Sequence, residues 1–175
     1  EMSPADWTPQ MRDDTWMAME DLHLEGKLRD IGVANFAKHH LEQLLRTCRV
    51  RPVINQVELH PLHTQQNLVR YCREQGIVVQ AYASLGGGDQ KQSPLLGHAQ
   101  VVKIAAAIDK TPAQVLLKWA LQHGIAIIPK TCREDRMKEN LDLHFTLSEE
   151  HMAALDAMNA DRRLTWKGVD LATIA

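Results

Sequence analysis

Residues 125–140 have the sequence IAIIPKTCREDRMKEN, an apolar run followed at once by charged residues with helical spacing. The apolar part, residues 125–129, has the length and the Ile content of a strand that is buried on both faces. Lys130 and Thr131 come at the turn, and Thr131-Cys132-Arg133-Glu134 predicts a capping box that begins a helix. This stretch therefore predicts a strand followed directly by a helix.

The same order recurs upstream along the chain. Short runs rich in Val and Ile lie at residues 31–35, 53–59 and 77–82, and each is followed by an amphipathic helical pattern. Alternating strands and helices are typical of a parallel sheet, and no linker interrupts the pattern. The helical spacing predicts the following apolar positions: Leu41, Leu44, Leu45, Cys48, Leu68, Tyr71, Cys72, Val101, Ile104, Ala105 and Ile108.

Helix boundaries are marked at several other places. Thr111-Pro112-Ala113-Gln114 combines a cap, a proline at the first helical position and a glutamine at the third. Ser148 begins a last helix that is expected to run to about Asn159. A further helix is expected over residues 14–24 and should end at Gly26. Its buried face should contain Trp16 and Met19, with Leu22 as a further candidate.

The composition excludes several classes of partner. The chain has 175 residues, 45% of them hydrophobic and 24% charged, and a formal net charge of −2. It lacks the basic excess that nucleic acid or an acidic membrane surface requires. Its apolar runs are far shorter than the roughly 20 residues of a membrane-spanning helix, and EMSPADW at the N-terminus does not resemble a signal peptide. Three cysteines without a C-x-x-C pair argue against a disulfide framework, so we expect a cytoplasmic protein.

The cations near the last strand suggest an anion site. Backbone N–H groups at a helix N-terminus carry partial positive charge, and Lys130, Arg133 and Arg136 surround that end in the sequence. Phosphate suits this arrangement because arginine binds two oxygens at once and lysine supplies a point charge. Alternatively, these residues form only a solvated helix face with weak surface ion pairs. The spacing alone leaves both interpretations open.

One long irregular stretch, residues 86–97 with the sequence GGGDQKQSPLLG, directly follows a predicted strand. Both an ordinary surface loop and a lid over a ligand are consistent with it, because long loops after strands are often functional. A complete barrel of parallel units needs eight units and about 250 residues, with its ligand site at the carboxyl ends of the strands. The chain contains about half of such a barrel.

Several stretches resemble the aldo-keto reductases and occur in that family's order: GKLRDIGVANF (26–36), PVINQVELHP (52–61), GIVVQAYASLGGG (76–88), TPAQVLLKWALQHGIAIIPKT (111–131) and REDRMKENLDLHFTLSEEHMAALDAMN (133–159). The resemblance covers nearly the whole chain from about Thr15 onward. It implies an α/β fold of parallel (β/α) units, the C-terminal half of a TIM (β/α)8 barrel, in a single partial domain over residues 1–175. It also implies an oxidoreductase that uses NADP(H).

The resemblance assigns the cofactor site residue by residue. Lys130, Thr131 and Arg136 would hold the 2′-phosphate that distinguishes NADPH from NADH, and Glu139 and Asn140 would lie beside the adenine.

The nicotinamide end of the cofactor is assigned in the same way. Tyr82 would stack on the flat nicotinamide ring, while Asn35 and Gln56 would hydrogen-bond its carboxamide. A pyrophosphate-binding loop, in which glycine lets the backbone come close, would consist of Leu85, Gly86, Gly87 and Asp89. Apart from the resemblance, the sequence favours simple packing for Tyr82 and an ordinary strand position for Gln56.

Three positions depart from the family pattern. Ala34 stands where a small hydroxyl residue is usual, Ala83-Ser84 replaces Ser-Pro, and Gly87 replaces a frequent Ser. Each lost neutral hydrogen bond costs on the order of 1 kcal/mol, so we expect weaker binding rather than none.

The family's catalytic groups have no counterpart in the sequence. The resemblance implies a Tyr proton donor, tuned by Lys, Asp and His, and all four belong to the N-terminal half of the family's barrel. Proton transfer to a carbonyl oxygen needs such a positioned acid. Tyr82 is assigned to stacking and Tyr71 to core packing, and His60 with His63 supplies two ligands where a zinc site needs more. We therefore predict no catalytic residue and no metal site.

Two functions follow from the sequence. The chain is either part of an NADP(H)-dependent carbonyl or alcohol oxidoreductase that is inactive alone, or a non-catalytic NADP(H)-binding or interaction module, a truncated product without turnover. A small-molecule carbonyl substrate would require a completed barrel. Exposed strand edges at residues 31–35 and 125–129 predict that the isolated chain self-associates or is poorly folded. Cys132 is expected to be a buried small residue, with a reactive thiol as the alternative. Trp166 lines a pocket or pins the tail, and the sequence does not decide between these.

Overall fold

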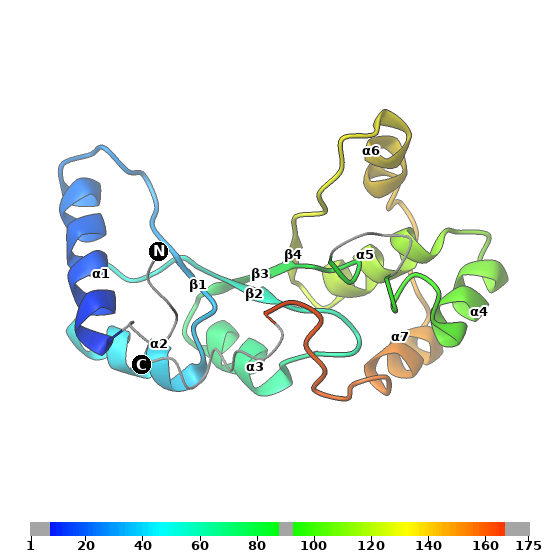
Figure 1. Cartoon of the computed structure of the whole chain (residues 1–175), viewed down its shortest axis with the longest axis horizontal. Helices are drawn as coiled ribbons and strands as arrows, with labels where there is room; N and C mark the ends of the chain where they lie inside the picture. Colours follow the sequence, from blue (N-terminus) through cyan, green and yellow to red (C-terminus); the bar gives the residue numbers. More distant parts are fainter. Residues whose placement is uncertain (1–7, 88–92, 167–175) are drawn as a thin grey trace. The chain divides into compact units, whose positions relative to one another are not determined.

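The computed structural model describes residues 8–87 and 93–166, which form two compact units. The described part of the first unit comprises residues 8–57 and 66–79. The second unit comprises residues 58–65, 80–87 and 93–166. One or two helices follow each strand along the chain (Figure 1), in the following order: α1 (Pro9–Leu24), β1 (Val33–Ala34), α2 (Lys38–Thr47), β2 (Ile54–Glu58), α3 (Gln66–Glu74), β3 (Val78–Tyr82), α4 (Ala99–Ala107), α5 (Pro112–Gln122), β4 (Ala126–Ile127), α6 (Glu134–Leu141) and α7 (Glu149–Asp156).

The strands pair in parallel, as the alternating pattern predicts. In the first unit β1 aligns with β2 so that Ala34 faces Gln56. In the second unit β3 aligns with β4 so that Ala81 faces Ile127. The sheet order is β1-β2-β3-β4. The predicted parallel α/β sheet is therefore confirmed, with β1 and β4 shorter than the apolar runs that predicted them.

Helix α1 begins earlier than residue 14, because Thr8 accepts a hydrogen bond from the Met11 N–H at 3.3 Å and Pro9 occupies the first turn. Trp16 is buried as predicted, and Met19 is half-buried. The prediction for Leu22 was wrong, since its side chain is 38% exposed.

Glu20, rather than Leu22, occupies the buried face of α1. The Glu20 carboxylate accepts hydrogen bonds from the backbone N–H groups of Arg49 and Val50 at 2.6 and 2.9 Å, and from the Trp16 indole at 3.1 Å. A buried carboxylate with this many donors joins α1 to the turn after α2.

Helix α5 is the central helix of the second unit, where it contacts α4, α6 and β4 (Figure 1). The capping box predicted at its start is confirmed, because Thr111 and Gln114 exchange side-chain-to-backbone hydrogen bonds of 3.2 and 3.0 Å. Its apolar residues Val115, Leu116 and Trp119 are almost completely buried. Among the described residues, no helix combines the length and the apolar character needed to cross a membrane.

The second predicted capping box was wrong. Helix α6 begins at Glu134, its N-cap is Arg133, and no side chain caps it. Thr131 instead accepts a hydrogen bond from the Arg133 N–H at 3.1 Å, which forms a tight turn two residues before the helix. Helix α7 has the predicted Ser148 cap but ends at Asp156, before the expected end near Asn159.

Candidate active site: two adjoining cavities in the second unit

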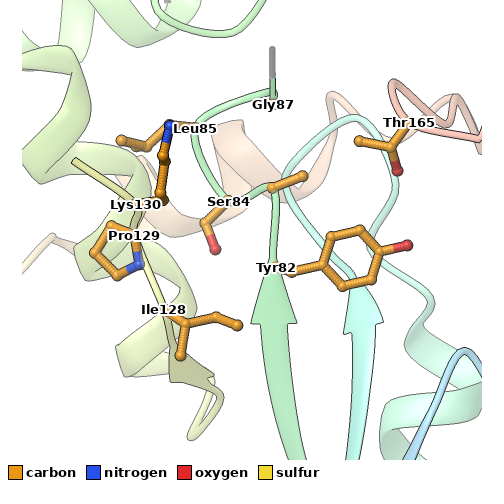
Figure 2. A pocket seen from close by; sticks show the side chains of 9 residues that line it. Tyr82, Ser84, Leu85, Gly87, Ile128, Pro129, Lys130 and Thr165 are labelled. Atoms are coloured by element: carbon orange, nitrogen blue, oxygen red, sulfur yellow. The ribbon is translucent and has the colours of Figure 1, made fainter. Parts of the chain in front are cut away.

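A cavity of about 370 Å³ lies at the carboxyl ends of β3 and β4, in the second unit. Carboxyl ends of parallel strands meet at one edge of a sheet, and this edge is the usual ligand site in such folds. Figure 2 shows Tyr82 and Ser84 at the end of β3, with Lys130 on one side and Thr165 on the other. The cavity is lined by Tyr82, Ala83, Ser84, Leu85, Gly87, Ile128, Pro129, Lys130 and Thr165.

Tyr82 presents a half-buried ring at this cavity. Burial raises the pKa of its phenol above the ordinary value of 10, and the nearby Glu58 carboxylate acts in the same direction. The ring is therefore neutral at neutral pH and suits stacking on another flat ring.

The backbone directly after β3 turns sharply. Ala83 adopts a left-handed conformation with φ 53°, and its carbonyl accepts the Gly86 N–H at 2.7 Å. Gly86 has φ 97°, and a side-chain atom there would clash with the Ser93 hydroxyl, which donates to the Leu85 carbonyl at 2.5 Å. Glycine is thus required at position 86 by both conformation and space. Asp89, assigned to the same loop, lies outside the described residues.

A second cavity of about 280 Å³ lies against α6 and the start of α5. Leu85 lines both cavities, so they adjoin at this residue. The second cavity is lined by Leu85, Leu96, Pro112, Ala113, Arg136, Glu139 and Asn140. It thus brings together three of the residues assigned to the phosphate and adenine end of a cofactor.

The cations of residues 130–138 divide into two groups. Lys130 lines the first cavity and Arg136 the second. Arg133 forms an ion pair with Asp135 on the surface, and Lys138 forms one with Glu134 at 2.7 Å. The solvated-face interpretation therefore describes Arg133 and Lys138, whereas Lys130 and Arg136 each line a cavity, and their binding of phosphate stays a prediction.

Asn35 and Gln56 are brought together in the first unit. The Asn35 N–H donates to the Gln56 carbonyl at 2.8 Å, at the carboxyl end of β1. Asn35 adopts a left-handed conformation with φ 60°, which asparagine tolerates better than most residues. Asn55 fixes the turn that follows, since its side chain donates to the Phe36 carbonyl at 2.9 Å.

A family model described as "Aldo/keto reductase family" matches residues 3–160. The chain belongs to the aldo/keto reductase family. It is 46% identical over 152 residues to a glyoxal reductase of Bacillus subtilis, a match that covers 86% of this chain and 53% of the relative. It is 37% identical over 160 residues to an NADPH-dependent D-xylose reductase of Meyerozyma guilliermondii, a match that covers 86% of this chain and 50% of the relative.

Solved aldo-keto reductases have the same fold. An aldo-keto reductase enzyme, MGS-M4, from a deep-sea metagenome library of the Medee basin superposes with a TM-score of 0.86 at 34% identity. The match covers 93% of this chain and 60% of that structure. The chain spans about half the length of the curated relatives it matches, and so corresponds to part of an aldo-keto reductase barrel.

The sequence did not indicate that Glu58 and Thr165 lie together at the first cavity. Glu58 is 1% exposed and contacts Thr165, which lines the first cavity. A signal was present, because a carboxylate at the end of a buried strand needs a partner. Nothing in the sequence identified the partner, since 107 positions separate the two residues.

Two further expectations concerned Cys132 and the histidine pair. Cys132 is exposed, so the expectation of a buried small residue was wrong. His60 and His63 are both buried, and His60 contacts the Glu58 carboxylate at 3.1 Å. No group of three or more metal-binding side chains occurs within residues 8–87 and 93–166.

Proposed function

We propose that the chain is the C-terminal half of an aldo-keto reductase barrel and that its second unit binds NADP(H) for the reduction of a small carbonyl compound. The two adjoining cavities are the observation that supports this most directly. One has Tyr82 and Lys130 on its walls, the other has Arg136, and Leu85 lines both. An elongated ligand with a flat ring at one end and a phosphorylated adenosine at the other fits such a pair.

Each part of this pair has a distinct role in the proposal. The neutral Tyr82 ring stacks on one face of the nicotinamide and leaves the other face of the nicotinamide exposed. The tight turn at Gly86 and Gly87 lets backbone N–H groups approach the pyrophosphate. Lys130 and Arg136 neutralise the phosphates, and Arg136 can bind two phosphate oxygens at once. When bound, NADPH supplies the hydride.

Binding can be tested by titrating the 175-residue chain with NADPH and NADH while following the fluorescence of its four tryptophans. We expect saturable binding with a preference for NADPH. The double variant Lys130→Ala/Arg136→Ala should weaken NADPH binding by at least about tenfold per cation, because charge-assisted hydrogen bonds contribute about 1.5–3 kcal/mol. Lys138→Ala removes one positive charge from the same helix outside both cavities and should leave the affinity unchanged. Equal losses in both variants would refute the assignment.

Turnover by the chain alone is not expected. Carbonyl reduction needs a proton donor near the hydride acceptor, and we propose that another segment provides it. Tyr82 lines the first cavity, but stacking leaves its hydroxyl without that role. We expect no NADPH oxidation with simple aldehydes. Measurable oxidation that Tyr82→Phe abolished would show that Tyr82 is itself the proton donor.

A second candidate is a non-catalytic NADP(H)-binding or interaction module. Among the described strands, β1 pairs only with β2 and β4 only with β3, so each has one edge without a strand partner. Such edges favour association with another chain. Size-exclusion chromatography should then show dimers or larger species. A sharp monomeric peak with a cooperative thermal transition would contradict this candidate.

A further inference from the structure

A buried carboxylate, Glu58 at the end of β2, has an unusually complete set of hydrogen-bond donors. Its Oε1 accepts from the Leu164 N–H at 2.5 Å and the Thr165 N–H at 3.1 Å, and it contacts the His60 ring at 3.1 Å. Its Oε2 accepts from the Thr165 hydroxyl. The carboxylate therefore holds two consecutive residues of the segment after α7.

These donors keep Glu58 charged. Burial by itself would raise its pKa, but the hydrogen bonds from His60, Thr165 and the Leu164 backbone outweigh burial and hold the pKa at about 2. Glu58 is consequently ionised at every pH at which the chain would function, and its contact with the segment does not change near neutral pH.

Other contacts guide the segment to this carboxylate. The Leu62 carbonyl accepts from the N–H groups of Ala160 and Arg162 at 3.2 and 2.9 Å. The Thr64 N–H donates to the Asn159 side chain at 3.1 Å. Glu58 therefore holds this segment where it reaches Thr165, and the next residue, Trp166, is 45% exposed but hydrogen-bonds with Tyr82.

The other side of the segment lies against the glycine turn of the first cavity. A Cβ atom placed on Gly87 would be 3.1 Å from Cγ2 of Thr165, and one placed on Gly86 would be 3.6 Å from Cδ1 of Leu164. Thr165 also lines the cavity (Figure 2), and its side chain hydrogen-bonds with Tyr82. One wall of the cavity is thus connected directly to Glu58.

We propose that Glu58 is a positioning residue of the cofactor site: its carboxylate fixes Leu164 and Thr165 as the wall of the first cavity and so sets the affinity for the nicotinamide end of NADPH. This inference rests on the proposed function for its ligand. The placement of the wall can be tested without any ligand.

The placement is tested by amide hydrogen exchange. Glu58→Gln keeps the side-chain volume but removes the negative charge and replaces one acceptor oxygen by an N–H₂ group, so the hydrogen bonds from the Leu164 and Thr165 N–H groups lose their charge assistance. We expect at least tenfold faster exchange at Leu164 and Thr165, and faster exchange at Gly86, whose N–H bonds within the turn that the segment covers. Glu150→Gln makes the same change on an exposed side chain of α7 and should have no effect. Unchanged exchange at Leu164 and Thr165 would overturn the proposal.

The effect on binding is tested by comparing two ligands. Adenosine 2′,5′-bisphosphate has no nicotinamide ring and can reach at most Lys130 in the first cavity, whereas NADPH also meets Tyr82 and the wall at Thr165. Removing a negative charge would, by electrostatics alone, tighten the binding of both anions. A positioning role predicts the opposite for NADPH only: several-fold weaker NADPH binding by Glu58→Gln and unchanged binding of the bisphosphate. Equal losses for both ligands, or tighter binding of both, would overturn it.

A second pair of variants covers the case in which Glu58→Gln does not fold. Thr165→Val keeps the methyl group against Gly87 and removes the hydroxyl bond to Glu58, whereas Thr165→Ser keeps the hydroxyl. We expect weaker NADPH binding with Val and near wild-type binding with Ser; the reverse order would overturn the proposal. If the wild-type chain binds neither ligand, the proposed function fails, while the exchange rates still decide whether Glu58 positions the wall.

Discussion

Acid should destabilise the chain through Glu58, and the size of the effect can be worked out from its environment. The pKa of this carboxyl is about 2 in the folded chain, against an ordinary value of 4.5. The folded state therefore binds this proton more weakly than the unfolded state does. The resulting stability is fully present above pH 4.5 and is lost as the pH falls toward 2.

The full contribution is about 3 kcal/mol, since 1 pKa unit corresponds to about 1.36 kcal/mol. Because the loss spreads over the interval between the two pKa values, about 2 kcal/mol of it should disappear between pH 7 and pH 3. Glu58 is almost completely inaccessible to solvent, so screening by water reduces this figure little.

The assay is the free energy of unfolding in urea at pH 7 and pH 3. Wild type should lose about 2 kcal/mol more than Glu58→Gln over this interval, whatever the absolute stability of the variant. His63 faces the same cluster, and its pKa is lowered by burial and by the positive charge of Arg163, so its protonation also destabilises the folded chain in acid. The Glu58 charge raises the His63 pKa, so in Glu58→Gln this contribution grows and reduces the difference between the two proteins. An identical pH dependence in the two proteins would refute the reasoning.

Three further changes test other parts of the fold. Gly86→Ala should destabilise the chain by about 1–3 kcal/mol in thermal unfolding, since it forces a left-handed alanine against the Ser93 hydroxyl. Trp119→Phe should cost about 1–2 kcal/mol in urea unfolding, because the indole N–H donates to Asp156 at 2.7 Å; unchanged stability would show that water replaces this bond. Glu20→Gln should cost at least about 1 kcal/mol and speed the exchange of backbone amides in the turn after α2, and unchanged exchange would argue against its role as an anchor.

The order of strands and helices could be predicted because both signals are local. Apolar runs and capping boxes depend on neighbouring residues, and the box at Thr111 forms as its sequence indicates. The box at Thr131 does not form, because its hydroxyl bonds the N–H two residues later, and this tight turn competes with the cap. The prediction that Leu22 is buried was wrong for another reason. Helical spacing allowed it a buried position, and only the tertiary contact to Glu20 shows which face of α1 is covered.

In the same way, local sequence patterns predicted some residues of the candidate site but not the residues that long-range contacts bring there. Tyr82 and Lys130 lie at one cavity because the carboxyl ends of parallel strands meet at one edge of the sheet. The helix after the last strand places Arg136 at the second cavity. The wall that completes the first cavity comes from the far end of the chain. Its position depends on long-range hydrogen bonds, of which those to the buried Glu58 carboxylate hold the two residues at the cavity, rather than on a repeating pattern.

Burial of Glu58 is tolerable because the Leu164–Thr165 backbone supplies donors, and the ionised Glu58 in turn holds that backbone. The two requirements satisfy each other, which is why the pair is stable although 107 positions separate its members. The same argument explains the cost of the arrangement. A variant that removes the Thr165 hydroxyl takes one donor from the buried carboxylate but keeps the backbone N–H groups, so Thr165→Val should affect the cavity in the same direction as Glu58→Gln, whereas Thr165→Ser should not.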